Sequence, residues 1–331
     1  MTSKMDEEAC DKTIEDNSPK HQHKPGIGLA LGSGMARGFS HIGVLKVLRR
    51  HGIAPTIVTG TSIGAVVGAA YLAGKLDDLE SWALSLNRMK ILSYMDFRVR
   101  SAGLMGGHRL QALLKQNFKD MEIEDLPYPF IAIASDLITG HEVWMRKGSL
   151  IEAMTASFSL PGVFPPVERN HRLLIDGALV NPVPVAPAQA MGARMTIAVD
   201  LNADIMGKSA KPGQTYQTVA GFDIFNDKDV PPDQQKKISS PLTRRLFRRQ
   251  ENNPSLFGVM VSALSIVQDR LTRSRLAGDP PDIHIKPYIG HIGLLEFEKA
   301  AELIALGEEA AEKAIPDIKE AMEVFLPPHY S

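Results

Sequence analysis

Apolar residues along this chain of 331 residues fall into two alternating patterns. Short apolar runs of the kind that form buried strands occupy residues 26–32, 57–59, 130–136, 141–147, 173–175, 195–200 and 282–286. Segments suited to helices, most with apolar residues at helical spacing, occupy 39–48, 63–70, 76–89, 109–118, 149–158, 256–276 and 297–324. The last is predicted as one long helix or as two helices separated at Pro316. Strands that alternate with helices predict an α/β fold, a mostly parallel sheet with helices on both faces.

Two stretches depart from this alternation and predict the domain organisation. Residues 1–24 are polar, of mixed charge and without an apolar segment, which predicts a disordered N-terminal tail and no secretory signal. Residues 203–253 are rich in Gly, Lys, Asp, Gln and Pro and predict an inserted polar and basic surface region. One domain is then formed by residues 25–202 and 254–331.

Composition and charge narrow the class of protein. The 44% apolar content is that of a globular chain with a sizeable core, and the net charge of −1 gives no indication of a nucleic-acid partner. The single Cys10 lies in the polar tail and forms no internal disulfide, which fits a reducing compartment. Residues 53–74 lack charge, but Pro55 and several Thr and Gly residues indicate a buried strand and helix, not a membrane span. We expect a cytoplasmic protein, or one peripheral to a membrane.

Candidate chemistry is concentrated first at a Gly-x-Ser-x-Gly sequence. Gly60, Ser62 and Gly64 follow an apolar strand-like run and precede a run of small residues suited to a helix. This is the strand–turn–helix context of a nucleophile elbow, in which a strained turn raises the serine hydroxyl above the sheet. The alternative is a glycine-rich turn with an idle serine.

A second glycine turn, Gly32-Ser33-Gly34-Met35-Ala36-Arg37-Gly38, also joins a strand to a helix. A dinucleotide site is a poor match, because Arg37 replaces the third glycine and no acidic residue lies between Asp16 and Asp77. A P-loop is excluded because its Gly-Lys-Ser/Thr ending is absent. The third interpretation is an oxyanion hole, in which backbone N–H groups at a helix N-terminus face one point. Arg37 would then brace the loop or face a phosphate.

These two turns, together with Asp176-Gly177-Ala178, resemble the motifs of the patatin-like phospholipase family. The segment 37–45 and the segment 287–290 are similar to the bacterial branch related to neuropathy target esterase. The resemblance implies a three-layer α/β/α sandwich that cleaves acyl esters of lipids with a serine–aspartate dyad. Ser62 would be the nucleophile and Asp176 its base. The remaining implied positions are the N–H groups around Ser33, Gly34 and Met35 for the oxyanion, and Gly32, Arg37, Gly38, Gly60, Gly64, Gly177 and Ala178 as motif support.

Departures from the family pattern and rival functions stay open at this point. Ser33 and Met35 stand where the family turn is richer in glycine. An α/β-hydrolase with a Ser–Asp–His triad would use a late histidine, His291 or His284. A non-catalytic lipid-binding or regulatory module would leave the dyad unused. No cofactor is implied and no metal-ligand cluster occurs at usable spacing, while phospholipid, lysophospholipid, thioester and simple ester substrates all fit.

The predicted insertion carries a basic cluster with two apolar residues between its cations. Its arginines are Arg244, Arg245, Arg248 and Arg249. A solvated loop is one interpretation of such a cluster. The other is peripheral docking onto the anionic headgroups of a membrane.

Overall fold

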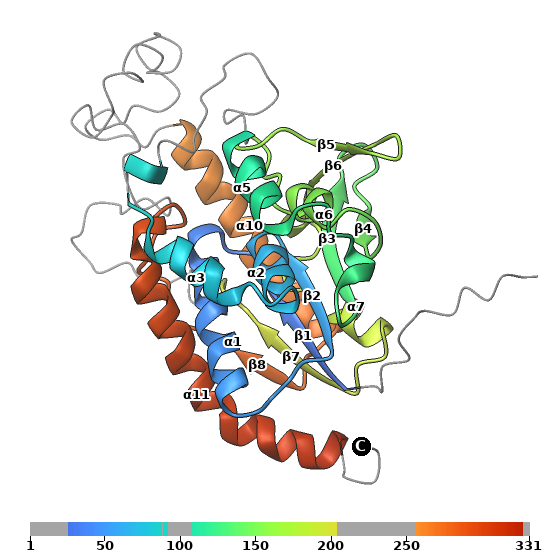
Figure 1. Cartoon of the computed structure of the whole chain (residues 1–331), viewed down its shortest axis with the longest axis vertical. Coiled ribbons are helices and arrows are strands. Elements are labelled where there is room, and N and C mark those ends of the chain that lie inside the picture. Colours follow the sequence, from blue (N-terminus) through green and yellow to red (C-terminus); the bar gives the residue numbers. More distant parts are fainter. Residues whose placement is uncertain (1–25, 88, 92–107, 204–255, 327–331) are drawn as a thin grey trace, which may run out of the picture.

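A single sheet lies at the centre of the computed structural model, which describes residues 26–87, 89–91, 108–203 and 256–326 (Figure 1). Its strands are β1 (Ile27–Leu31), β2 (Ile57–Thr61), β3 (Phe130–Asp136), β4 (Glu142–Met145), β5 (Val167–Arg169), β6 (Arg172–Asp176), β7 (Met195–Val199) and β8 (Ile283–Ile285). Within the described ranges they form an eight-stranded sheet in the order β5-β6-β3-β2-β1-β7-β8, with β4 paired to β3.

The sheet is parallel through its centre and antiparallel at one edge. Strands β8, β7, β1, β2 and β3 are parallel, whereas β4, β5 and β6 pair antiparallel. Every residue of β1, β2, β3 and β7 is buried, which explains their continuous apolar runs. The predicted α/β fold is confirmed. The short strand β5 was not predicted, because its three residues, none of them buried, carry no apolar run.

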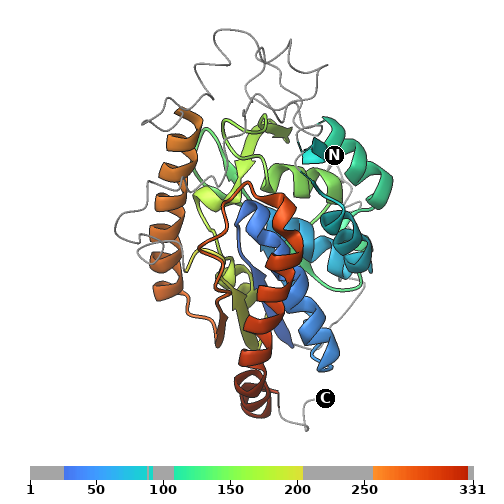
Figure 2. The ribbon, with the colours of Figure 1, turned by 90° about the vertical axis from the view of Figure 1, so that its left-hand side faces the viewer.

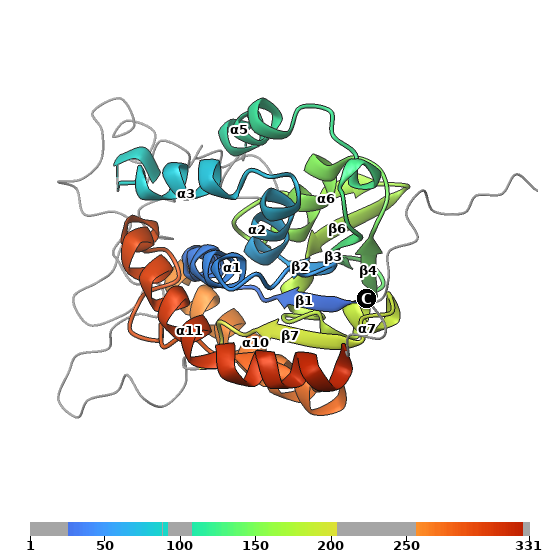
Figure 3. The ribbon, with the colours of Figure 1, turned by 60° about the horizontal axis from the view of Figure 1, so that its bottom comes forward.

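Helices cover both faces of this sheet. They are α1 (Ser40–Arg50), α2 (Ile63–Leu72), α3 (Leu76–Leu84), α5 (His108–Phe118), α6 (Leu150–Ser157), α7 (Val185–Ala190), α10 (Leu256–Gly278) and α11 (Ala300–Phe325). Four short 3₁₀ segments join them among the described residues: η1 (Met35–Phe39), η2 (Ile123–Asp125), η3 (Gly177–Leu179) and η4 (Phe297–Lys299). Figure 2 shows α10 (orange) on one side of the sheet and the blue and teal helices α2, α3 and α5 on the other. Figure 3 shows α10 and α11 beside β7.

One predicted helix is shorter in the structure, and the C-terminal segment forms one long helix, which is one of its two predicted alternatives. The helix predicted over 76–89 ends at Leu84, because the Ser85 hydroxyl donates to the Trp82 carbonyl and Asn87 caps the N–H of Lys90. The C-terminal helix runs unbroken through Pro316, and Figure 1 shows it bending in its last turns. The predicted tail 1–24 lies outside the described residues, as does the predicted insertion 203–253 beyond residue 203.

Candidate active site

The ends of β2 and β6 meet beside β3, and this meeting point is where the candidate dyad lies. Thr61 pairs with Ile133, and Asp176 pairs with the next residue, Ala134. Strand β4 pairs with the same stretch of β3 on its other side, so β2 and β6 share one side of β3 and approach each other end to end. The residue after Thr61 is Ser62. The antiparallel direction of β6 therefore places the last residue of that strand against the elbow.

Ser62 has the strained backbone expected of a nucleophile elbow. Its φ of 58° and ψ of −124° lie in a region that non-glycine residues rarely adopt. Its N–H donates to Ser157 Oγ at 2.9 Å, and that hydroxyl donates to the carbonyl of Ile133 at 2.6 Å. Gly64 is required because a Cβ there would collide with the carbonyl of Leu31. The sequence did not identify Ser157, because only the fold brings α6 to the elbow.

Ser62 and Asp176 form a direct hydrogen bond. Ser62 Oγ donates to Asp176 Oδ2 at 2.7 Å, and the N–H of Ala178 donates to Asp176 Oδ1 at 2.8 Å. Asp176 is 2% exposed, and burial raises its pKa from 3.8 to about 7, against the opposing effect of the two hydrogen bonds. The Ser135 hydroxyl also donates to the backbone carbonyl of Asp176. The carboxyl group is therefore fixed in place and more basic than an ordinary aspartate.

The glycine turn 32–38 lies beside Ser62, and the structure corrects one of its predicted roles. The N–H of Ser33 donates to the carbonyl of Pro182 at 2.9 Å, so it is not available to an oxyanion. The N–H groups of Gly34 and Met35 have no hydrogen-bond partner among the described residues. Met35 has φ of 51°, a left-handed conformation that favours glycine. The candidate oxyanion donors are thus Gly34 and Met35.

Arg37 connects this turn to the segment 290–292. Its guanidinium is buried, and it donates from Nε to the carbonyl of Ile292 at 2.7 Å and from Nη2 to that of Gly290 at 3.3 Å. Of its two predicted roles, these contacts match the brace.

A Cβ would collide with neighbouring atoms at each glycine of the three motifs, namely Gly32, Gly34, Gly38, Gly60, Gly64 and Gly177.

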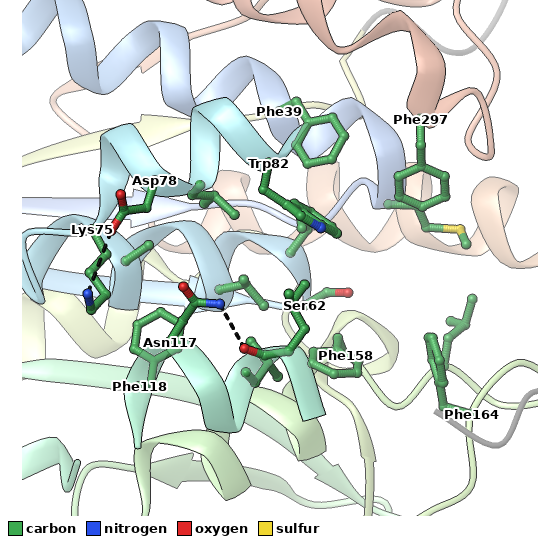
Figure 4. Close-up of a pocket in the computed structure, with 18 of the residues that line it drawn as sticks. Phe39, Ser62, Lys75, Asp78, Trp82, Asn117, Phe118, Phe158, Phe164 and Phe297 are labelled. Atoms are coloured by element: carbon green, nitrogen blue, oxygen red, sulfur yellow. Dashed lines mark hydrogen bonds and ion pairs between the residues drawn. The ribbon is translucent and has the colours of Figure 1, made fainter. Parts of the chain in front are cut away.

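Ser62 and Asp176 open onto two cavities. The larger is about 170 Å³ and mostly apolar, with aromatic walls formed by Phe39, Trp82, Phe118, Phe158, Phe164 and Phe297. Figure 4 shows Lys75 and Asp78 at one end of this cavity, Phe164 and Phe297 at the other, and Ser62 between them. The smaller cavity is lined by the glycine turn and by one face of α10, including Ser33, Gly34, Ser265 and Gln268. Met35 and Leu160 line both cavities.

The two candidate triad histidines are paired elsewhere. His291 is exposed and bonded to Glu302 at 2.8 Å, and His284 faces Asp200 at 3.3 Å. Among the described residues, no histidine lines either cavity that contains Ser62. His41 is buried behind the site and bonded to the carbonyl of Gly32, and burial lowers its pKa to about 4. The geometry therefore supports a serine–aspartate pair, not a triad.

Metal binding and membrane contact are the remaining features that the sequence analysis considered. The described part of the chain contains no group of His, Cys, Asp or Glu suited to a metal ion. Among the described helices, none combines the length and apolar content that crossing a bilayer requires. Residues Arg244, Arg245, Arg248 and Arg249 lie outside the described residues, so their predicted contact with a membrane stays a prediction.

Comparison with known proteins adds to this geometry. A model of the family described as patatin-like phospholipase matches residues 29–188. An uncharacterized NTE family protein of Mycobacterium tuberculosis is 34% identical over 338 residues, which cover 91% of this chain and 93% of that protein. Patatin-like phospholipase domain-containing protein 6 of Mus musculus is 34% identical over 182 residues, which cover 53% of this chain and 13% of that protein.

Among solved structures, VipD from Legionella pneumophila superposes with a TM-score of 0.45 at 11% identity, covering 88% of this chain and 67% of that chain. The similarity in sequence is much closer, since the mycobacterial relative is matched over nearly its full length. The matched family model spans both the glycine turn and the elbow and extends past Asp176. The chain therefore belongs to the NTE family and carries a patatin-like phospholipase domain.

Proposed function

We propose that this protein is a serine acyl hydrolase that cleaves lipid esters through an acyl-enzyme, with Ser62 as nucleophile and Asp176 as base. The observation that carries the proposal is the 2.7 Å hydrogen bond from a strained serine to a buried carboxylate at the wall of an apolar cavity. A serine hydroxyl is a weak nucleophile and needs an adjacent base. Membership of a family with a phospholipase domain supports a lipid substrate.

The proposed reaction has two stages. Ser62 Oγ bonds to the ester carbonyl carbon while its proton passes to Asp176 Oδ2, and the oxygen that gains charge accepts from the N–H groups of Gly34 and Met35. The tetrahedral intermediate then expels the alcohol, which takes the proton from Asp176. In the second stage a water attacks the acyl-enzyme, gives a proton to Asp176, and releases the fatty acid while Ser62 regains its proton.

The larger cavity is suited to the acyl chain. It is lined from α2 by Ile63, Val66 and Ala70, which follow Ser62 at helical spacing on one face. A helix rises 1.5 Å per residue, so this wall extends about 12 Å from the nucleophile. Burial of a hydrocarbon chain along such a wall would supply binding free energy in proportion to the apolar area covered.

The proposal is tested by labelling with a fluorophosphonate probe and by turnover of p-nitrophenyl esters. Wild type should label and turn over, Ser62→Ala should do neither, and Asp176→Asn should lose most turnover. Ser81→Ala is the control, because Ser81 is exposed on α3 and lines neither cavity. Equal labelling of wild type and Ser62→Ala would overturn the proposal. Absence of turnover with every acyl ester in a folded wild type would favour a lipid-binding module.

A further inference from the structure

One buried hydroxyl close to the dyad stands apart from its neighbours. Ser33 is 2% exposed, and its Oγ has no hydrogen-bond partner among the described residues. The other buried serines of the described ranges all donate, as shown by Ser40, Ser62, Ser135, Ser157, Ser159 and Ser265. Leaving a buried hydroxyl unsatisfied disfavours folding, so such a group in a native structure requires an explanation.

The position of Ser33 supplies one. Ser33 is among the residues that line the smaller cavity, together with Ser62, Asp176, Gly34 and Met35. Its own N–H is fixed to Pro182, which anchors the residue, and the next two N–H groups along the turn are the candidate oxyanion donors. If the acyl chain occupies the larger cavity, the carbonyl oxygen of an ester at Ser62 lies toward the smaller one. Ser33 therefore belongs to the wall of the cavity toward which the developing negative charge would point.

We propose that the Ser33 hydroxyl is a third donor to the oxyanion, beside the N–H groups of Gly34 and Met35. This inference rests on the proposed function. A hydroxyl that is buried without a partner among the described residues, and that gains one only when the tetrahedral oxygen forms, stabilises the transition state more than the ground state. Its effect should accordingly appear in kcat and not in KM.

The test is Ser33→Ala, assayed with a p-nitrophenyl ester and with the corresponding alkyl ester. We expect kcat to fall about a hundredfold to a thousandfold on both esters, with KM little changed. The melting temperature should stay the same or rise, because the Ser33 hydroxyl makes no hydrogen bond to any residue that the structure describes. Ser40→Ala is the matched control. The Ser40 hydroxyl donates to the backbone carbonyl of Arg37, and Ser40 lines neither cavity. The melting temperature of this variant should therefore fall while its kcat is kept.

Three outcomes would overturn the inference. An unchanged kcat in a folded Ser33→Ala protein would show that the hydroxyl contributes nothing to the reaction. A melting temperature that falls as in Ser40→Ala would mean that the hydroxyl has a structural partner. A loss confined to the alkyl ester would mean that it serves the leaving group. Failure of the proposed function is distinguishable, because turnover that survives in Ser62→Ala refutes the dyad whatever Ser33→Ala does.

Discussion

Asp176 is subject to two opposing requirements at the scale of a single residue. Burial makes its carboxylate a better base by raising its pKa to about 7. The same burial makes the ionised form costly for the folded protein, because a charged group loses its hydration. The proposed base thus has a pKa near neutral pH at the expense of stability, which is a common arrangement at active sites.

The first consequence is a dependence of activity on pH. Only ionised Asp176 can accept the proton of Ser62, so kcat/KM should rise through about pH 7 as a single ionisation and then level off. This pH dependence is checked by measuring kcat/KM for the hydrolysis of a p-nitrophenyl ester from pH 5 to pH 9, with a correction for spontaneous hydrolysis. His41 should not contribute, since its lowered pKa keeps it neutral over that range. A flat profile would contradict the role of Asp176 as base.

The second consequence concerns stability. The folded state binds the Asp176 proton more tightly than the unfolded chain does. The protonated carboxyl group therefore adds its full contribution to the free energy of unfolding below about pH 4, and this contribution is lost as the pH rises through about 7. An asparagine does not ionise, so Asp176→Asn should not lose stability in this way as the pH rises. At pH 8 the variant should be more stable than wild type, by up to roughly 4 kcal/mol in free energy of unfolding, and the difference should shrink toward pH 4.

Asp136 is the matched control for this measurement. It ends β3 as Asp176 ends β6, but hydrogen bonds from the N–H groups of Thr139 and Ile138 lower its pKa. Its contribution is therefore present at neutral pH and is lost on acidification. Denaturant unfolding should show Asp136→Asn to be less stable than wild type at pH 8. Parallel behaviour of the two variants would refute the opposite environments assigned to the two carboxyl groups.

At the scale of elements, two glycines let α1 and α11 pack closely. A Cβ on Gly43 would collide with the carbonyl of Ile304, and one on Gly307 would collide with the carbonyl of Ser40. Side chains at either position would force the helices apart. Helix α1 follows directly on the glycine turn, and Arg37 of that turn is bonded to the segment that precedes α11. The helix contact therefore supports the turn as well as the core.

Gly307→Ala should destabilise the protein for this reason. We expect a loss of about 1–3 kcal/mol in free energy of unfolding, because the new methyl group meets backbone that cannot rotate away. Gly278→Ala is the control: Gly278 ends α10, and a methyl group added there would meet no atom within 4 Å, so stability should be unchanged or slightly higher. Chemical denaturation of both variants checks the difference, and equal stabilities would refute the close helix contact.

The apolar cavity is a property of the whole molecule. Its walls come from η1, α2, α3, α5, the loop that follows α6, and η4, which lie far apart in the sequence. Edge-to-face ring contacts hold parts of the wall in place, with ring centres 6.1 Å apart for Phe39 and Trp82 and 5.4 Å apart for Phe158 and Phe164. Under the proposed function, the length of acyl chain that this cavity would accept thus depends on residues that no single element contributes.

Ala70→Phe should shorten the accepted chain. Ala70 lines the cavity two helical turns beyond Ser62, so a larger side chain there fills the end of the α2 wall and leaves the dyad free. We expect kcat/KM for p-nitrophenyl laurate to fall at least tenfold while that for p-nitrophenyl butyrate is kept. The butyrate rate serves as the internal control for folding. Equal losses on both esters would contradict the placement of the acyl chain.

The sequence by itself determined the features that depend on local conformation. The apolar runs predicted the buried strands, and the glycines around Ser62 predicted the elbow, because both follow from backbone geometry over a few residues. The resemblance of the three motifs to the patatin-like phospholipase family implied the partnership of Ser62 and Asp176, whose side-chain oxygens lie 2.7 Å apart in the structure. The role of that pair in catalysis stays a prediction for the experiments above.

Only the tertiary structure decided the features that depend on distant partners. The antiparallel direction of β6 brings Asp176 to the elbow, and a strand's apolar pattern does not encode its direction. The N–H of Ser33 donates to the carbonyl of Pro182, so only Gly34 and Met35 remain as candidate oxyanion donors of the predicted three. The sequence allowed Arg37 either to brace the loop or to face a phosphate. In the folded chain its guanidinium donates to the carbonyls of Gly290 and Ile292, which matches the brace. Hydrogen bonds and packing between remote segments fix these details, and they arise only when the chain is folded.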